Sequence, residues 1–200
     1  MNISMVNVEE LVNCIRTLNV NGHSPATSTN YSFRDNQGRF WVSRSGIDKA
    51  QMLSTDFIEM SSKGIPQPPI EAIVPSAETG IHCALYELFP ETNVILHSHD
   101  PWSIIHAHGK KSILFEGYEL QKAFPSIQTH EGIIQIPVIP NSQDMAEIKE
   151  ALSARKEELK FQVFMIEKHG FYSWANSLFE AKRILEAFSY LCFVDHHLNK

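Results

Sequence analysis

Two short apolar segments that each lead into histidines constrain the fold more than any other feature of the chain. Residues 93–99 read NVILHSH, and residues 161–170 read FQVFMIEKHG. Apolar, β-branched and aromatic residues packed into so short a run are typical of buried strands. We predict two strands that end at the same edge of one sheet, so that His97, His99 and His169 meet there.

The rest of the chain alternates between helical and extended patterns. Apolar residues recur every three or four positions from Val6 to Leu18, which predicts a first helix. Further helices are predicted at 54–60 with Ser54 or Thr55 as N-cap, and at 76–89, 100–110, 116–124, 143–160 and 177–199. A hairpin is predicted at 31–42 and a strand at 132–140, with at most one short strand around 72–74.

The whole chain is predicted to form one domain. No internal repeat, low-complexity tract or linker divides the 200 residues. Because helices and strands alternate throughout, we predict a single α/β domain over residues 1–200, with a central β-sheet flanked by helices.

Charge and cysteine content exclude several classes of protein. Asp and Glu outnumber Lys and Arg by 23 to 17, so the formal net charge is −6 and a nucleic-acid partner is not expected. The first residues carry an acidic pair and no basic region, unlike a signal peptide, and no apolar run approaches the roughly 20 residues of a membrane span. Three separated cysteines without a CxxC pair favour reduced thiols. We therefore expect a cytoplasmic protein with no membrane partner.

The histidine spacing suggests a metal site. His97 and His99 stand two positions apart on a predicted strand, where alternation places both rings on one face. Two such imidazoles can reach one divalent ion, and His169 is the best candidate for a third nitrogen ligand. An HxH pair also arises by chance among ten histidines. The second pair, His106 and His108, lies on a predicted helix, where residues two apart point about 200° apart and cannot share an ion.

The other histidines are expected to have structural or hydrogen-bonding roles. His196 and His197 lie at the end of the last predicted helix, where the helix dipole favours imidazolium. His23, His82 and His130 have no partner that the sequence assigns, so core packing or hydrogen bonding is the default.

Six segments carry a more specific signal than the histidine spacing alone. They are PATSTNYSFR (25–34), SRSGIDK (43–49), PSAET (75–79), LHSHDPWS (96–103), EKHGFYSWA (167–175) and a middle region with FEGYELQKAF, THEG and IPVIPNSQDM. In this order they resemble the class II aldolase and adducin-type family nearly end to end. The first three are similar to its substrate loops, the next two to its metal-binding segments, and the middle to its dehydratase branch. The chain departs from the family pattern at Thr29, Gly80 and Ala175.

The resemblance implies a single-domain class II aldolase-like fold with one Zn²⁺ per subunit on His97, His99 and His169. It also implies a homotetramer with active sites near subunit boundaries. The implied reaction converts a small-molecule sugar phosphate, 5-methylthioribulose 1-phosphate, to 2,3-diketo-5-methylthiopentyl 1-phosphate in methionine salvage. The alternatives are a zinc-dependent sugar-phosphate aldolase or epimerase with the same histidines, and a non-catalytic module like the adducin head.

Two glutamates compete for the acid/base role in that reaction. Glu119, in GYELQK, stands at the position that resembles the dehydratase carboxylate, and Glu78, in PSAET, matches the catalytic carboxylate of the aldolases. We assign the main role to Glu119 and a second base, water-positioning or substrate-contact role to Glu78. A general acid at neutral pH needs a raised pKa, which burial can supply. The alternative for both is an ordinary surface or capping glutamate.

The three loops that resemble the family's phosphate pocket supply the candidate phosphate ligands Asn30, Ser45, Gly46 and Ser76. Backbone N–H groups and hydroxyls can hold a dianion without a basic cluster. Thr29 stands where the family usually has glycine, and its side chain narrows the backbone approach to a phosphate.

Several residues near these loops have two open interpretations. Arg34 and Lys49 add positive charge to the phosphate pocket or are plain surface cations. Two alternatives are open for four aromatic residues: they line an apolar pocket for the methylthio group, or they pack in the core. These residues are Trp102, Phe171, Tyr172 and Trp174.

Overall fold

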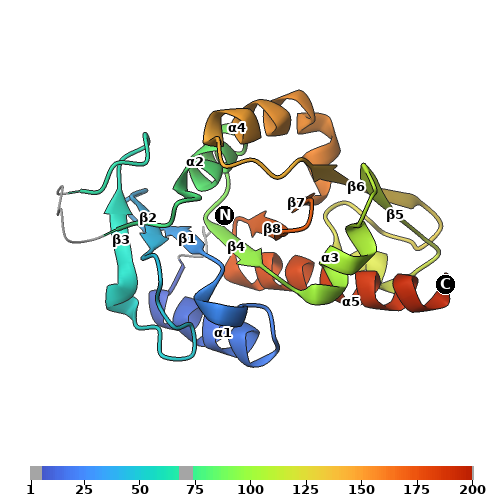
Figure 1. Cartoon of the computed structure of the whole chain (residues 1–200), viewed down its shortest axis with the longest axis horizontal. Coiled ribbons are helices and arrows are strands. Elements are labelled where there is room, and N and C mark those ends of the chain that lie inside the picture. Colours follow the sequence, from blue (N-terminus) through green and yellow to red (C-terminus); the bar gives the residue numbers. More distant parts are fainter. Residues whose placement is uncertain (1–5, 68–73, 200) are drawn as a thin grey trace.

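The centre of the molecule is a sheet of eight strands in the order β3–β2–β1–β4–β8–β7–β6–β5 (Figure 1). The computed structural model describes residues 6–67 and 74–199. Neighbouring strands are antiparallel except β6 and β7, which are parallel. The strands are β1 (Tyr31–Arg34), β2 (Phe40–Ser43), β3 (Phe57–Met60), β4 (Val94–Ser98), β5 (Ser112–Glu116), β6 (Ile133–Ile139), β7 (Val163–Ile166) and β8 (Gly170–Ala175).

Helices cover both faces of this sheet (Figure 1). One apolar cluster joins the sheet to α1 (Val8–Val20), α3 (Pro101–Ala107) and α5 (Leu178–Leu198). A second cluster, on the other face, joins it to α2 (Thr79–Leu88) and α4 (Met145–Ala154). The predicted fold class, a central sheet flanked by helices, is therefore confirmed.

Short 3-10 helices lie at Pro25–Thr27 (η1), Ser54–Asp56 (η2), Glu119–Ala123 (η3) and Lys156–Phe161 (η4). Within residues 6–67 and 74–199, no helix is both long and apolar enough to cross a membrane.

Side-chain caps explain where the predicted helices begin. The Asp100 carboxylate accepts a hydrogen bond of 2.8 Å from the Ser103 N–H, and Pro101 occupies the first turn of α3, as predicted. The Ser177 hydroxyl accepts from the Glu180 N–H at the start of α5. That helix then buries the apolar face expected from its periodicity.

Strands β4 and β7 run in the same direction because each is antiparallel to β8, which lies between them. Both strands therefore end at the same edge of the sheet, as the sequence predicts. Strand β7 stops at Ile166, so that His169 lies in the turn before β8 rather than on the strand itself. No sequence pattern predicts β8, although this strand lies between the two strands whose ends carry the histidines.

Several other predicted elements differ from the structure. The prediction of a helix at 54–60 is wrong: after the single turn of η2 the chain enters β3, whose apolar side chains are buried and which pairs with β2. The helix predicted at 143–160 is divided into α4 and η4 at Arg155, whose guanidinium donates to the Val138 carbonyl at 2.8 Å. Of the helix predicted at 116–124, only Glu119–Ala123 is helical, as the 3-10 helix η3, and Glu116 ends β5, which no sequence pattern predicts. Apart from Val74, the short strand expected around 72–74 lies outside the described residues.

Two leucines on α5 test the burial of this helix. Leu185 has no exposed surface, whereas Leu198 is 69% exposed. We expect Leu185→Ala to lower the free energy of unfolding by about 2–5 kcal/mol, because it leaves a cavity in the core. Leu198→Ala, the matched control, should change it by less than about 0.5 kcal/mol. Urea unfolding followed by circular dichroism measures both, and equal losses would contradict the packing of α5.

Candidate metal centre

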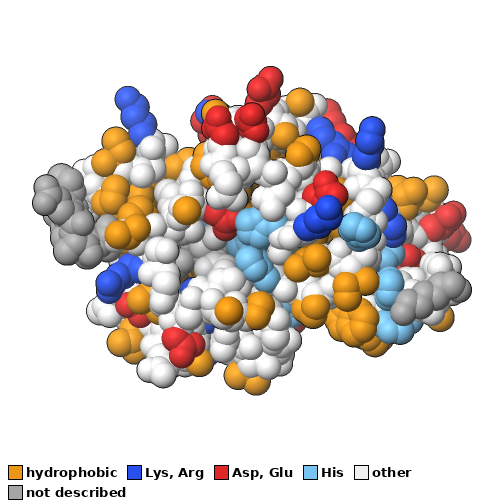
Figure 2. Space-filling model, in the orientation of Figure 1, with side chains coloured by type: hydrophobic (Ala, Val, Ile, Leu, Met, Phe, Trp, Pro, Cys, Tyr) orange, Lys and Arg blue, Asp and Glu red, His pale blue; other side chains and the backbone are white. Residues whose placement is uncertain are grey.

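Three histidines from the ends of two strands meet at one edge of the sheet. His97 is the fourth residue of β4, His99 follows that strand, and His169 lies in the β7–β8 turn. One ring nitrogen from each lies within 4.8 Å of the other two. His97 is fully buried, and the other two are partly exposed. Figure 2 shows histidine side chains at the surface near the middle of this face, beside an acidic side chain.

The backbone of β8 orients His97 for metal binding. The Nδ1 atom of His97 lies 2.8 Å from the Phe171 carbonyl oxygen, which can only accept, so Nδ1 carries the proton. The Nε2 lone pair is then free, and it faces the Nε2 atom of His99 at 2.9 Å. Burial lowers the pKa of His97 to about 3 and that of His99 to about 4. Neutral imidazole is the form that binds a metal, and a set of three histidine nitrogens is one that zinc accepts.

Strand β8 passes close to His97 and His99 at the end of β4, and this close approach requires glycine at position 170. A Cβ atom there would lie 2.3 Å from the Ser98 carbonyl oxygen, 2.8 Å from the His99 ring and 3.0 Å from the His97 ring. The glycine that follows His169 in the sequence is therefore a packing requirement of the site.

A carboxylate also lies at this centre. Oε1 of Glu78 is 2.9 Å from His169 Nε2, and Oε2 is 3.5 Å from His97 Nε2. Burial raises the pKa of Glu78, but the hydrogen bonds with His169 and the Tyr172 hydroxyl outweigh it and hold the pKa well below its ordinary range. Glu78 is therefore ionised, a state that accepts a proton.

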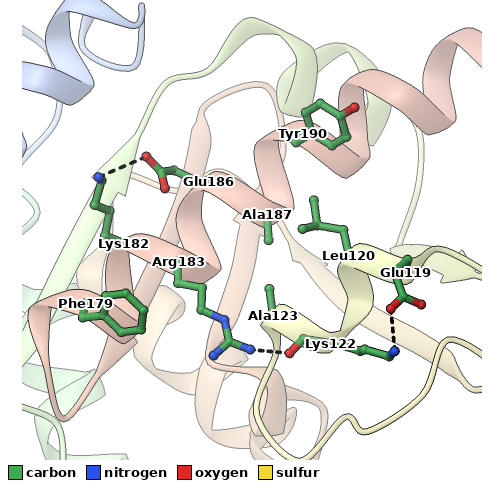
Figure 3. Close-up of a pocket in the computed structure, with 10 residues that line it drawn as sticks. All are labelled: Glu119, Leu120, Lys122, Ala123, Phe179, Lys182, Arg183, Glu186, Ala187 and Tyr190. Atoms are coloured by element: carbon green, nitrogen blue, oxygen red, sulfur yellow. Dashed lines mark hydrogen bonds and ion pairs between the residues drawn. The ribbon is translucent and has the colours of Figure 1, made fainter.

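The structure places Glu119 away from His97, His99 and His169 of its own chain. Its side chain is 72% exposed and forms ion pairs with Lys122 at 2.5 Å and His130 at 3.4 Å. The hydrogen bond with Lys122 lowers the pKa of Glu119, the opposite of what a general acid at neutral pH needs. Glu119 lines a groove of about 750 Å³ between η3 and α5. Figure 3 shows its carboxylate turned toward Lys122. In the part of the chain that the structure describes, Glu119 has no contact with the three histidines.

The three predicted phosphate loops lie side by side. Arg44 forms a β-bridge with Pro75, and the Ser45 N–H donates to the Val74 carbonyl at 3.0 Å, so the loop with Ser45 and Gly46 adjoins the one with Ser76. The Ser76 hydroxyl accepts from the Glu78 N–H at 3.2 Å, just before α2. The Asn30 amide donates to Glu78, which brings the first loop to the same place.

Lys49 is not a surface cation. Only 1% of it is exposed, and its Nζ donates to the carbonyls of Thr27 at 3.2 Å and Ile47 at 2.9 Å. It thereby ties the first loop to the second. Arg34 instead lies over the Tyr86 ring, 4.4 Å from its centroid, away from these loops. Sequence alone gives no signal that separates these two cations.

Thr29 has a positive φ of 70°, which explains why glycine is usual at this position. Its hydroxyl lies 3.0 Å from both the Ser24 and the Tyr31 hydroxyls. The side chain therefore belongs to a hydroxyl cluster behind the loop.

The aromatic candidates for a methylthio pocket are largely core residues. Phe171, Tyr172 and Trp174 are fully buried, and Trp102 packs edge-on against Phe193.

The remaining histidines have the structural contacts expected of them. His23 bonds to the Ser98 hydroxyl at 2.8 Å, and His82 lies in the core on α2. His106 is buried and stacks on Phe115, whereas His108 is exposed. His196 and His197 lie against the Trp102 ring. The three cysteines are free thiols, as predicted.

Two glycines test the packing of the metal centre. We expect Gly170→Ala to weaken zinc binding about 10- to 100-fold, because the new methyl group displaces the two histidine rings. Gly132→Ala is the matched control, since a Cβ there meets nothing within 4 Å. Competition with a chelator measures the zinc affinity. Equal affinity of the two variants would show that the close approach of β8 is not needed.

Comparison with known proteins agrees with this geometry. Residues 9–195 match the class II aldolase and adducin N-terminal domain. A methylthioribulose-1-phosphate dehydratase from Picosynechococcus is 43% identical over 92% of this chain and 88% of its own length. The dehydratase of that name from Xanthomonas campestris is 37% identical over 95% of this chain and 88% of its own length.

Solved structures show the same fold. An L-fuculose-1-phosphate aldolase from Thermus thermophilus superposes with a TM-score of 0.75 at 18% identity, covering 96% of this chain and 97% of its own. A putative aldolase/epimerase/decarboxylase from Escherichia coli superposes with a TM-score of 0.79 at 19% identity, covering 96% of this chain and 88% of its own. The match over residues 9–195 and the shared fold lead to one conclusion: the chain belongs to the class II aldolase and adducin family.

Proposed function

We propose that this chain dehydrates 5-methylthioribulose 1-phosphate to 2,3-diketo-5-methylthiopentyl 1-phosphate, with a zinc ion on His97, His99 and His169. The observation that carries the proposal is the centre itself, where three imidazoles converge and the ionised Glu78 contacts two of them. The choice of substrate is supported by relatives at 43% and 37% identity that are named as this dehydratase. The reaction belongs to methionine salvage, and the free thiols suit the cytoplasm.

The reaction removes a proton from the carbon beside a ketone and hydroxide from the next carbon, which together make one water. A zinc ion, when bound, supplies Lewis acidity for the negative charge that develops on the substrate oxygens. Glu78 is equipped to accept a proton, because it is ionised and already lies among the histidines. The hydrogen bond of 2.8 Å from the Tyr172 hydroxyl holds its carboxylate in place.

Glu119 is assigned the main acid/base role at the centre of a neighbouring copy, with Glu78 as the second base. Support comes from the groove beside Glu119, where large apolar side chains are exposed: Phe179 by 73%, Tyr190 by 58% and Leu120 by 38%. Such a surface favours contact with another subunit, as in the homotetramer that the family resemblance implies. Burial in that contact would raise the pKa of Glu119, which a general acid needs.

The substrate phosphate is proposed to bind where the loops with Asn30, Ser45, Gly46 and Ser76 meet at the N-terminus of α2. The helix dipole and the backbone N–H groups there favour an anion. The buried Lys49 adds a positive charge behind the first two loops.

A product assay tests the reaction. Zinc-loaded protein incubated with 5-methylthioribulose 1-phosphate should yield a dicarbonyl product, trapped as a quinoxaline by o-phenylenediamine. We expect His97→Ala to lose zinc and turnover together, because it removes a proposed ligand. Dialysis against a chelator should stop turnover, and added zinc should restore it. Release of dihydroxyacetone phosphate from fuculose 1-phosphate, without dehydration, would instead make the protein an aldolase.

Mixed oligomers test which chain supplies Glu119 to a given set of histidines. We expect His97→Ala and Glu119→Gln to be nearly inactive alone. Coexpressed chains should recover roughly a quarter of the wild-type turnover, since some sites then combine intact histidines from one chain with an intact Glu119 from another. Turnover of the purified mixed oligomers is the measurement. A mixture as inactive as its parents would place Glu119 in its own chain's site, and a fully active Glu119→Gln would make Glu78 the main base.

A further inference from the structure

A series of hydrogen bonds runs from the metal centre into the core behind it. Oε2 of Glu78 accepts from the Asn30 amide and from the Tyr172 hydroxyl. The Asn30 Oδ1 atom lies 2.5 Å from His82 Nε2 on α2. On the other side of that ring, Nδ1 lies 2.7 Å from the Ser32 hydroxyl of β1.

The series ends at Tyr86, whose hydroxyl lies 3.0 Å from the Ser32 oxygen. We call the four residues Asn30, His82, Ser32 and Tyr86 the buried relay. Each is at most 6% exposed, so water does not compete for their polar atoms. None of them touches the three histidines of the centre through a hydrogen bond among the described contacts.

The donors and acceptors of the relay can be arranged in one way only. The NH₂ group of Asn30 donates to Oε2 of Glu78, so this end of the amide faces the carboxylate. The Asn30 oxygen then faces His82, so Nε2 of His82 must carry the ring proton. Its Nδ1 atom therefore accepts from the Ser32 hydroxyl, and the Ser32 oxygen accepts from Tyr86. Every donor points toward Glu78.

The surroundings keep these protonation states fixed. Burial lowers the pKa of His82 to about 3, so the ring stays neutral near pH 7. Burial likewise raises the pKa of Tyr86, whose hydroxyl keeps its proton. The edge of the His82 ring packs against Tyr172, with 5.7 Å between the ring centroids.

We propose that His82 is a positioning residue for Glu78, because its Nε2–H fixes the Asn30 amide with the NH₂ group toward the carboxylate. The amide and the Tyr172 hydroxyl then anchor Oε2, while Oε1 faces His169. Without the His82 donor, the Asn30 amide can turn its carbonyl toward Glu78, which repels the carboxylate and displaces it. The catalytic part of this inference rests on the proposed role of Glu78 as a base.

Kinetics of His82 variants test the positioning role. We expect His82→Phe to lower kcat about 10- to 100-fold, because small displacements of a reacting group are costly, with KM changed less than about threefold. Zinc content should remain one ion per chain. His82→Gln should recover most of the loss, since its amide can donate where Nε2–H did. His106→Phe is the control for loss of another buried histidine, and its kcat should stay within about twofold of the wild-type value.

A spectroscopic measurement needs neither substrate nor variant. The ¹⁵N chemical shifts of His82 in the wild-type protein should show a protonated Nε2 and a bare Nδ1 from about pH 5.5 to 8.5, with and without zinc. A protonated Nδ1 or an imidazolium in this range would overturn the proposal, as would equal losses of kcat in His82→Phe and His106→Phe. If the wild type shows no dehydration, the proposed function fails, while the nitrogen shifts still decide the relay.

Discussion

The antiparallel pairing of β4 with β8 is the constraint on which the rest of the site depends. It sets His97 opposite Tyr172, and it brings the Phe171 carbonyl to the Nδ1 atom of His97. Adjacent strands lie only about 4.8 Å apart, so the turn before β8 must pass close to the end of β4. Gly170 makes this passage possible, because any side chain there would occupy the space of the Ser98 carbonyl and the histidine rings. One strand pairing thus fixes the tautomer of His97 and brings the three histidines together.

The second half of the site is built by α2, which links the loops to the sheet. Glu78 precedes this helix and points at the histidines, while His82, one turn later, points into the core behind them. Residues four apart lie on the same side of a helix, so the carboxylate and the group that orients its partner share one face. Asn30 connects the two from β1's preceding loop. The carboxylate is therefore held by a rigid helix and a paired strand rather than by the loops alone.

Much of this arrangement could be predicted from sequence, where local patterns carry the information. The apolar runs before His97 and His169 predict that two strand ends meet at one edge, and Asp100 with Pro101 predicts the start of α3. The strands that the sequence does not predict depend on pairing with other strands. Segment 57–60 forms a strand because it can pair with the edge of β2. Strand β8 follows β7 after so short a turn that the sequence pattern does not separate the two strands.

Some residues of the site can likewise be identified from the sequence, and others cannot. Ligand type and spacing identify the three histidines, since a metal demands a definite set of donors. Nothing in the sequence shows that Glu78 rather than Glu119 adjoins them within one chain, because that depends on where α2 and η3 pack. The buried relay is equally invisible, since His82, Ser32 and Asn30 are brought together by the packing of α2 on β1 and not by sequence spacing.

The net charge of −6 gives no reason to expect a nucleic-acid partner, and it says little about the ions that this site can hold. Glu78 lies among the histidines, and its charge favours their protonated forms, whereas Lys49 opposes protonation of His99. Burial, with which Lys49 acts in the same direction at His99, outweighs the effect of Glu78 at His97 and His99 and keeps those rings neutral. Among the described residues no carboxylate forms an ion pair with Lys49. Two carbonyl oxygens accept from it, and Asp48 and Asp56 favour its charged form from a longer distance. Under the proposed function, the Lys49 charge favours an anion at the loops, while Glu78 presents the opposite charge toward a cation on the histidines. Local placement of these two charges, rather than their sum over the chain, then lets one site hold both kinds of ion.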